Sequence, residues 1–262
     1  MITKNKIQQL AQILYHAHKS NTPINQFDTD LNIAEAYQIQ EALAQSLLLE
    51  NNIIGYKMGL TNRHKMKLMN VNEPLHGYLF SNMLSKDGTN LYSSDLIQPK
   101  VEMEIAFKLR TDLSGLSITP EEIINATEYI TPALEIVDSR FTNFNFTFTE
   151  GIADNICAAK VIFGQKQIPP TSIDLSKINA RLCINEEQIV TASSSSVLDN
   201  PIYSIIELVK MLYKKGDGLK AGQIIISGAM ADAVTLTKNS TISAQFDKLG
   251  TVSFNYINNK KP

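Results

Sequence analysis

Two glutamates in one apolar run carry the clearest chemical signal in the chain. Glu102 and Glu104 alternate with apolar residues in the run Val101–Phe107. Because side chains alternate faces along a β-strand, both acids share one face, about 7 Å apart. At that distance their repulsion is about 2.4 kcal/mol for an effective dielectric of about 20. A solvated strand face tolerates this repulsion, and a cation bound between the acids removes it.

A third acid lies in a second run typical of a strand. Glu135 sits within residues 132–138, where most neighbours are apolar. Three carboxylates carried by strands suit a hard divalent cation that keeps open positions for a substrate. Asp138 falls on the opposite strand face from Glu135, so we expect it to pair with Arg140 or to cap a turn.

The elements around these acids predict an α+β protein. Residues 1–50 have helical periodicity, and the capping-box spacing from Asn32 to Glu35 starts a helix running to about residue 51. Thr119-Pro120 starts another helix, expected to end just before Thr131-Pro132. Further expected elements are a glycine-punctuated strand at 53–60, short helices at 61–70 and 199–215, and strands at 223–227, 233–236 and 241–246.

This order gives two expected regions, a helical N-terminal region at 1–84 that includes the Lys57 loop, and a β-rich core at 85–262. Strands and helices do not alternate regularly enough for a doubly wound sheet or a (β/α)₈ barrel. The spacing of glycines around Gly216-Asp217-Gly218 fits neither a Rossmann nor a Walker A phosphate loop.

Composition narrows the function classes. The 262 residues are 44% hydrophobic and 19% charged, with a net charge of −2, so nothing indicates nucleic acid or an anionic membrane as a partner. Residues 1–20 lack the apolar core of a signal peptide, and no apolar run approaches the ~20 residues of a membrane span. Cys157 and Cys183 lie in apolar runs, typical of reduced buried thiols. We therefore expect a cytoplasmic protein.

Five segments, taken in order, resemble the 2-keto-4-pentenoate hydratase/4-oxalocrotonate decarboxylase family, which is related in fold to fumarylacetoacetate hydrolase. The resemblance runs from about residue 30 to about residue 255. The segments are Gly55–Thr61, Pro99–Phe107, Pro132–Arg140, Ala153–Asn155 and Leu219–Gly228. The resemblance implies a mixed β-roll core with a helical N-terminal region. It also implies Mg²⁺ or Mn²⁺ held by Glu102, Glu104 and Glu135, which favours the metal site over a solvated strand face.

The resemblance further implies a small 2-oxo acid as substrate, chelated by the metal through its carboxylate and keto oxygens. Members act on dienoates formed from aromatic ring-cleavage products. They are oligomeric, so we expect at least a homodimer, and decarboxylases of the family can associate with a hydratase partner enzyme.

Lys57 is the expected proton carrier. Alone, a lysine between Gly55 and Gly59 can be a side chain that reaches solvent from a strand edge. The motif favours a lysine beside the metal, its pKa lowered by burial and by the cation. Gly59 and Leu60 are expected to offer backbone N–H groups to the substrate carboxylate.

The run Pro74-Leu75-His76-Gly77 bears on the reaction. Hydratases of the family often carry an aspartate where this chain has Leu75, and an apolar side chain there dries the pocket and favours decarboxylation. Asn143–Phe146 also resembles the decarboxylase branch. His76 could instead hold the water needed for hydration. We expect decarboxylation of 2-oxohex-3-enedioate, with hydration of 2-hydroxypenta-2,4-dienoate as the alternative.

Two rival functions stay open at this point. One is a non-catalytic relative that binds an oxo acid, and the other is C–C bond hydrolysis of the fumarylpyruvate type. Hydrolysis calls for a histidine–carboxylate pair, and His76 has no evident carboxylate partner in the sequence. Asp154 and Asn155 fit either turn hydrogen bonding or support of the metal site. Residues 63–65 fit either a solvated helix face or recognition of a distal substrate carboxylate.

Overall fold

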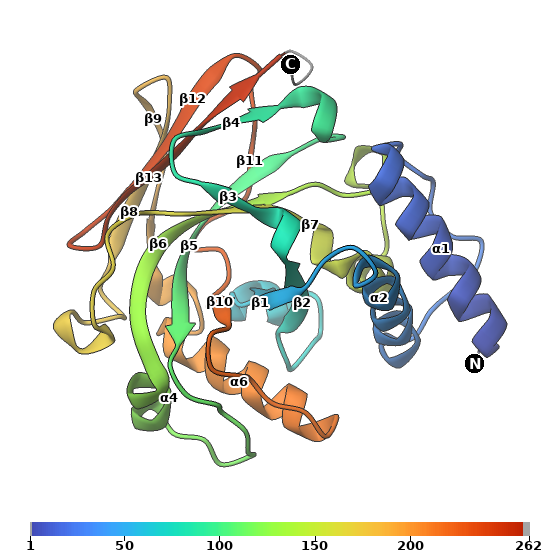
Figure 1. Cartoon of the computed structure of the whole chain (residues 1–262), viewed down its shortest axis with the longest axis horizontal. Helices are drawn as coiled ribbons and strands as arrows, with labels where there is room; N and C mark the ends of the chain where they lie inside the picture. Colours follow the sequence, from blue (N-terminus) through green and yellow to red (C-terminus); the bar gives the residue numbers. More distant parts are fainter. Residues whose placement is uncertain (1, 259–262) are drawn as a thin grey trace.

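The computed structural model describes residues 2–258. Its main parts are two β-sheets and a pair of N-terminal helices (Figure 1). The first sheet has the order β2-β1-β10-β5-β6-β7-β3, with β11 also paired to β5. Its strands are β1 (Ile53–Gly59), β2 (Leu75–Phe80), β3 (Leu84–Lys86), β5 (Lys100–Leu109), β6 (Thr127–Val137), β7 (Ala158–Phe163), β10 (Ile224–Ile226) and β11 (Val234–Thr235).

The second sheet is five-stranded within the described residues and has the order β4-β13-β12-β8-β9. Its strands are β4 (Thr89–Tyr92), β8 (Asn179–Ile184), β9 (Glu187–Ser193), β12 (Ser240–Phe246) and β13 (Gly250–Ile257). The helices are α1 (Lys4–Ser20), α2 (Ile33–Leu47), α3 (Arg63–Leu68), α4 (Pro120–Ala126), α5 (Phe148–Ala153) and α6 (Pro201–Lys214).

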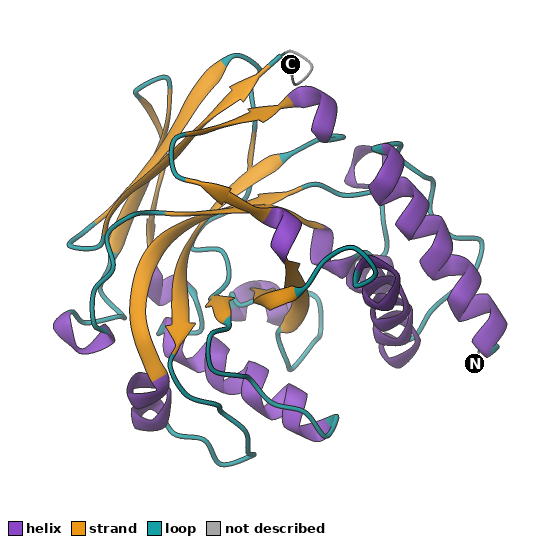
Figure 2. Ribbon diagram, in the orientation of Figure 1, coloured by secondary structure: helices purple, strands orange, loops and turns teal. Residues whose placement is uncertain are grey.

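Strand alternation divides β5 between two hydrophobic layers, as the sequence predicts. Val101, Met103, Ile105 and Phe107 are buried in the larger core, which joins the first sheet to the second sheet and α6. The opposite face carries Glu102, Glu104 and Ala106, and Ala106 belongs to a second core shared with α1 and α2. The acids therefore lie on the face of the sheet that packs against the N-terminal helices. Figure 2 shows these helices in purple beside the orange strands.

The helix starts follow the predicted caps. Asn32 and Glu35 form a capping box at the start of α2, and Thr119 and Glu122 form one at the start of α4. The expected end of the second of these helices is wrong. It ends at Ala126, because residues 127–131 pair with β5 as part of β6. Tertiary strand pairing thus overrides the local helical signal.

Pro132 lies inside β6 although proline lacks the N–H that a ladder uses. It pairs with Ile105, and its carbonyl accepts a hydrogen bond from Gly164 N at 2.8 Å.

The expected division of the chain near residue 84 does not follow the sheets. Strands β1 and β2 pair with each other and with β10, far along the sequence, and β3 spans residue 84 itself. Only α1 and α2 form a separate layer, on the right in Figure 1. Among the described residues, no helix has the length and apolar character to cross a bilayer.

A gap in strand pairing lies beside the acids. β10 pairs with residues 106–108 of β5, and β11 pairs with residues 100–101. Between these two strands, the connecting segment 227–233 makes two backbone–backbone hydrogen bonds to β5, Ser227 N to Ile105 O and Met230 N to Met103 O, each 3.0 Å. This departure from regular pairing makes room for a cavity next to Glu102 and Glu104.

Candidate metal centre and its cavity

The three predicted acids converge in space. Glu102 of β5 pairs directly with Glu135 of β6, and Glu104 lies two residues farther along the same face. One carboxylate oxygen from each residue lies within 4.8 Å of the other two. The cluster therefore arises from strand register, which places adjacent-strand side chains side by side.

The cluster lies largely inside the protein and not on a solvated strand face. Glu104 and Glu135 are fully buried, and Glu102 is half-buried. Burial raises the pKa of all three carboxyls, and repulsion from Glu135 and Glu102 raises that of Glu104 further. The pKa of Glu135 rises to about 7. Ionising all three acids therefore needs positive charge close by.

The donor set fits a hard divalent cation. Glu104 Oε1 and Glu135 Oε1 are buried and accept no hydrogen bond from any described residue. Carboxylate oxygens that lack donors and point into one cluster are the ligands that Mg²⁺ and Mn²⁺ prefer. These residues could hold such an ion, and the ion would compensate their buried charge.

Gly228 fixes the second oxygen of Glu104. Its N–H donates a hydrogen bond to Glu104 Oε2 at 2.7 Å. Gly228 has a φ of 105°, and a Cβ added there would lie 2.2 Å from Thr61 Oγ1. Only glycine fits this conformation and this space. The segment 227–233 thereby orients a predicted metal ligand.

Lys57 enters the cluster from β1. Its ammonium group lies 2.8 Å from Glu135 Oε2 and donates a hydrogen bond to the carbonyl of Ile156 at 3.2 Å. Burial acts to lower its pKa, but Glu135, Glu102 and Glu104 outweigh burial and raise the pKa above its usual value. The expected lowering of the pKa is therefore reversed among the protein's own groups, and these groups keep Lys57 charged.

The carbonyl that receives Lys57 belongs to an unusual turn. Asn155, Ile156 and Cys157 have φ values of 52°, 51° and 59°. This left-handed region is costly for residues other than glycine, above all for β-branched isoleucine. Asn155 stabilises the turn, because its side chain accepts a hydrogen bond from Tyr78 N at 2.7 Å and donates one to Tyr78 O at 2.9 Å. Asn155 thus supports the site through backbone geometry, one of the two roles open from the sequence.

A cavity of about 320 Å³ adjoins the cluster, at the low end of the range typical of ligand pockets. Of the predicted site residues it is lined by Lys57, Gly59, Leu60 and Glu102. The sequence analysis did not assign a role here to Lys100, Phe144, Ile156 or Asp232, which also line it. Glu104 and Glu135 lie deeper, behind the lining residues.

His76 does not line this cavity. On β2 it pairs with Met58, not with Lys57, so its ring lies on the opposite face of the sheet from the acids. It is fully buried, stacks on Tyr37 at 5.0 Å between ring centroids, and has no hydrogen-bond partner on either ring nitrogen among the described residues. Burial lowers its pKa to about 3. Substrate contact by His76, an expectation from the sequence, is not supported by this placement.

Leu75 lies on the face of the acids but outside the lining. It pairs with Gly59 and packs with Ile152, Leu60 and Ile156. Leu60 and Ile156 line the cavity, so Leu75 supports an apolar wall from behind.

One expectation was that Asp138 pairs with Arg140, and the structure shows no direct ion pair between these two described residues. Asp138 accepts hydrogen bonds from Ile97 N at 2.8 Å and Gln98 N at 2.7 Å, which is the turn-capping alternative. Arg140 Nε lies 2.5 Å from Asp154 Oδ1 instead. This buried pair joins the segment after β6 to the turn that follows α5.

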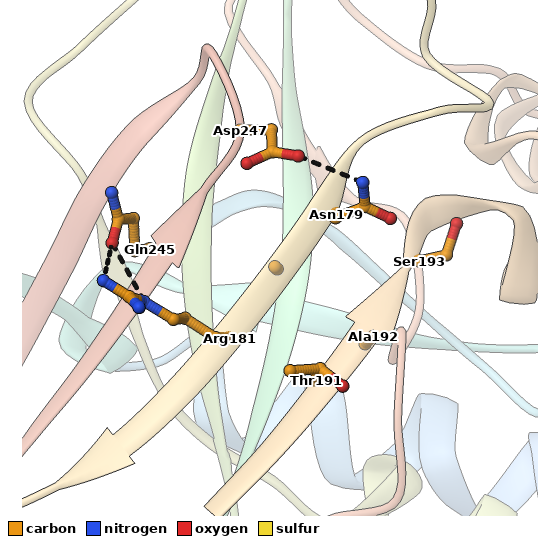
Figure 3. Close-up of a pocket in the computed structure, with 8 residues that line it drawn as sticks. Asn179, Arg181, Thr191, Ala192, Ser193, Gln245 and Asp247 are labelled. Atoms are coloured by element: carbon orange, nitrogen blue, oxygen red, sulfur yellow. Dashed lines mark hydrogen bonds between the residues drawn. The ribbon is translucent and has the colours of Figure 1, made fainter. Parts of the chain in front are cut away.

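A second hollow lies on the five-stranded sheet, away from the acids. It has a volume of about 740 Å³ and is bordered by β8, β9 and β12 (Figure 3). Its polar side chains already bond to one another: Arg181 Nη2 donates to Gln245 Oε1 at 2.6 Å, and Asn179 Nδ2 donates to Asp247 Oδ2 at 3.0 Å. It offers no cluster of unpaired groups comparable to the acids.

Comparison with known proteins identifies relatives over the whole chain, although no family model matches. The 2-keto-4-pentenoate hydratase of Paraburkholderia xenovorans (strain LB400) is 33% identical over 263 residues, which cover 99% of this chain and 98% of the relative. The 4-oxalocrotonate decarboxylase of Pseudomonas putida is 30% identical over 260 residues and 98% of both chains.

Solved structures agree. The 4-oxalocrotonate decarboxylase from Pseudomonas putida G7, complexed with magnesium and adipate, superposes with a TM-score of 0.94 at 29% identity, over 98% of this chain and 99% of that one. A fumarylpyruvate hydrolase from Pseudomonas aeruginosa, at 13% identity and a TM-score of 0.60 over 78% of this chain and 89% of that one, shares the fold. These likenesses confirm the expected fumarylacetoacetate hydrolase type of fold. The chain belongs to the 2-keto-4-pentenoate hydratase/4-oxalocrotonate decarboxylase family of lyases.

Proposed function

We propose that this lyase is a decarboxylase of 2-oxohex-3-enedioate that uses Mg²⁺ or Mn²⁺ held by Glu102, Glu104 and Glu135. The observation that carries the proposal is the largely buried cluster of three acids and one lysine beside a cavity with an apolar wall. Relatives solved in complex with magnesium and with calcium support the use of a divalent ion.

The bound ion would supply positive charge that polarises the 2-oxo group and favours electron flow toward its oxygen. In the decarboxylation, the C5–C6 bond breaks and C6 leaves as CO₂. The electron pair moves through C5, C4 and C3 to the C2 oxygen, which then takes a proton and gives 2-hydroxypenta-2,4-dienoate. Lys57 is placed to donate that proton, because its ammonium group is held between Glu135 and the Ile156 carbonyl.

Backbone groups orient the other end of the acid. We propose that Gly59 and Leu60, at the end of β1, offer N–H groups to the substrate's C1 carboxylate. The side chain of Ile156 packs directly over Gly59, and a Cβ added at Gly59 would lie 2.8 Å from Ile156 Cγ2. A larger residue at position 59 would therefore displace Ile156.

The apolar wall favours decarboxylation over hydration. Hydration needs a water molecule held at the distal carbon beside an acid or base. Leu75, Leu60 and Ile156 supply no such acid or base, and His76 lies on the other face of the sheet. Hydration of 2-hydroxypenta-2,4-dienoate is the second candidate, supported by the hydratase relative at 33% identity.

Product identification tests the assignment. The purified protein is incubated with Mg²⁺ and either 2-oxohex-3-enedioate or 2-hydroxypenta-2,4-dienoate, and products are followed by NMR. We expect CO₂ release from the first compound and slower hydration of the second. Fast hydration without decarboxylation would reassign the protein as a hydratase. Oxo-acid binding without turnover of either compound would identify a non-catalytic relative.

We also propose a cytoplasmic protein that forms at least a homodimer and can associate with a partner enzyme of the same route. Family likeness supports these proposals. Light scattering at micromolar concentration tests the homodimer, and a monomer at that concentration would contradict it.

A further inference from the structure

We infer that Lys65 and Lys100 bind the second carboxylate of a dicarboxylic oxo acid at the mouth of the cavity. The inference rests on the proposed function and adds to it the residues that would select a dicarboxylic substrate over a monocarboxylic one. Both lysines line the same cavity as Lys57 and Glu102.

Lys65 comes from α3 and is held by Asp232 of the segment 227–233 in an ion pair. Its side chain is 50% exposed and that of Asp232 is 85% exposed, so the pair lies at the opening. Exposed ion pairs contribute little stability and exchange partners at low cost. An arriving carboxylate can therefore bind Lys65 together with Asp232, or take the place of Asp232 beside Lys65.

Lys100 starts β5, two residues before the first predicted metal ligand. Its ammonium group lies 4.2 Å from the centroid of the Phe144 ring. No carboxylate of the described residues lies within ion-pair distance of it. A cation held over an aromatic ring keeps free N–H donors for an anion.

The lysines lie close enough to the acids for one small ligand to reach both. Lys65 and Lys100 line one cavity of about 320 Å³ together with Lys57 and Glu102. The cavity therefore has an acidic end suited to a cation and an oxo acid, and a basic mouth suited to a carboxylate. A six-carbon dicarboxylic oxo acid matches this polarity, whereas a five-carbon monocarboxylic acid leaves the mouth unused.

The reaction predicts how these contacts divide between binding and turnover. In the decarboxylation the distal carboxylate is the group that leaves as neutral CO₂, so its attraction to a lysine weakens in the transition state. Such a contact stabilises the bound substrate more than the transition state. Loss of either lysine should therefore raise KM while kcat stays unchanged or rises.

The binding test uses 2-oxoadipate and 2-oxopentanoate with the Mg²⁺-loaded full chain in titration calorimetry. We expect the native protein to bind 2-oxoadipate more tightly. Lys65→Met and Lys100→Met should each raise the Kd for 2-oxoadipate about tenfold and that for 2-oxopentanoate less than twofold. Asp232→Asn, which removes the competing carboxylate, should tighten 2-oxoadipate. Lys67→Met, on the same helix but outside the lining, is the matched control and should change neither Kd.

The outcomes separate this inference from the proposed function. Equal binding of the two acids by the native protein, or equal weakening of both by the lysine variants, would overturn the inference alone. Failure of the Mg²⁺-loaded native protein to bind either acid would overturn the proposed function and the inference together. In steady-state decarboxylation, a fall in kcat at unchanged KM for Lys65→Met would also refute a role limited to substrate capture.

Discussion

The two faces of the β1–β2 ribbon each bury an ionisable side chain, and the surroundings shift the two pKa values in opposite directions. Lys57, on one face, meets three carboxylates that raise its pKa. His76, on the other face, meets Tyr37, Tyr56 and Tyr78, and burial lowers its pKa. Both side chains are uncommon in protein interiors. The comparison shows that charged neighbours keep a buried titratable group charged, whereas burial among aromatic rings favours its neutral form.

The largest expected effect is loss of a carboxylate from the charged face. Glu104→Gln keeps the size and the hydrogen bond from Gly228 but removes one negative ligand. We expect Mg²⁺ binding by calorimetry to be lost and decarboxylase activity to fall by about 10³-fold or more. Removal of the metal with EDTA should have the same effect on native protein. Glu128→Gln, an exposed change on the neighbouring strand β6, is the control. Full activity of metal-free Glu104→Gln would refute the metal-centre assignment.

Loss of the lysine comes next. Lys57→Ala should lower kcat by about 10²–10⁴-fold while Mg²⁺ still binds. Lys57→Arg should not restore turnover, because a planar guanidinium cannot take the place of a compact ammonium group between Glu135 and the Ile156 carbonyl. Stopped-flow kinetics and metal titration measure the two quantities separately. A change in KM alone would identify Lys57 as a substrate contact and not as a proton donor.

The uncharged face should affect stability and not turnover. With a pKa of about 3 when folded and about 6.5 when unfolded, His76 costs no stability above pH 6.5. As the pH falls below 6.5 the unfolded chain takes up the proton first, and the native state should lose about 2 kcal/mol by pH 5. In urea unfolding, His76→Gln should lack this part of the acid sensitivity, whereas His16→Gln, an exposed change, should retain it. A kcat for His76→Gln below about half the native value at pH 7.5 would contradict the comparison.

The smallest effect is expected where the ribbon meets the cavity wall. Leu75→Asp places a carboxyl behind Leu60 and Ile156 and should shift the product ratio toward hydration by a few-fold. Leu75→Asn, similar in size but without the charge, controls for lost packing. NMR of the two products from parallel reactions gives the ratio. An unchanged ratio in Leu75→Asp, with folded protein, would show that this wall does not select the reaction.

Local pattern was sufficient to predict the acids. Glu102 and Glu104 share a face because of strand alternation, and Glu135 lies on a strand of the same kind, so their convergence needed only correct pairing of neighbouring strands. Lys57 was found through the glycine-flanked motif. The position of His76 was not predictable, because it depends on the register Met58↔His76. A shift of one residue in that register would have turned its ring toward the acids.

Contacts made by loops were also beyond the sequence. The Ile156 carbonyl, the Gly228 N–H and the placement of Lys65 near Lys100 depend on how the turn after α5 and the segment 227–233 cross the sheet. The predicted end of α4 was wrong for a related reason, because pairing with β5 makes residues 127–131 part of a strand. Periodicity describes one segment at a time and carries no information about such crossings.

The left-handed turn at 155–157 sets stability against activity at a single position. Ile156→Gly would relieve an unfavourable φ and open space over Gly59, and relief of backbone strain alone raises stability. The same change would make the backbone carbonyl that accepts the Lys57 hydrogen bond more mobile, and it would remove the isoleucine side chain from the apolar wall. Screening for heat resistance would therefore favour a glycine at 156, and screening for turnover would reject it. The isoleucine marks a place where this enzyme keeps a less stable backbone in exchange for a fixed lysine.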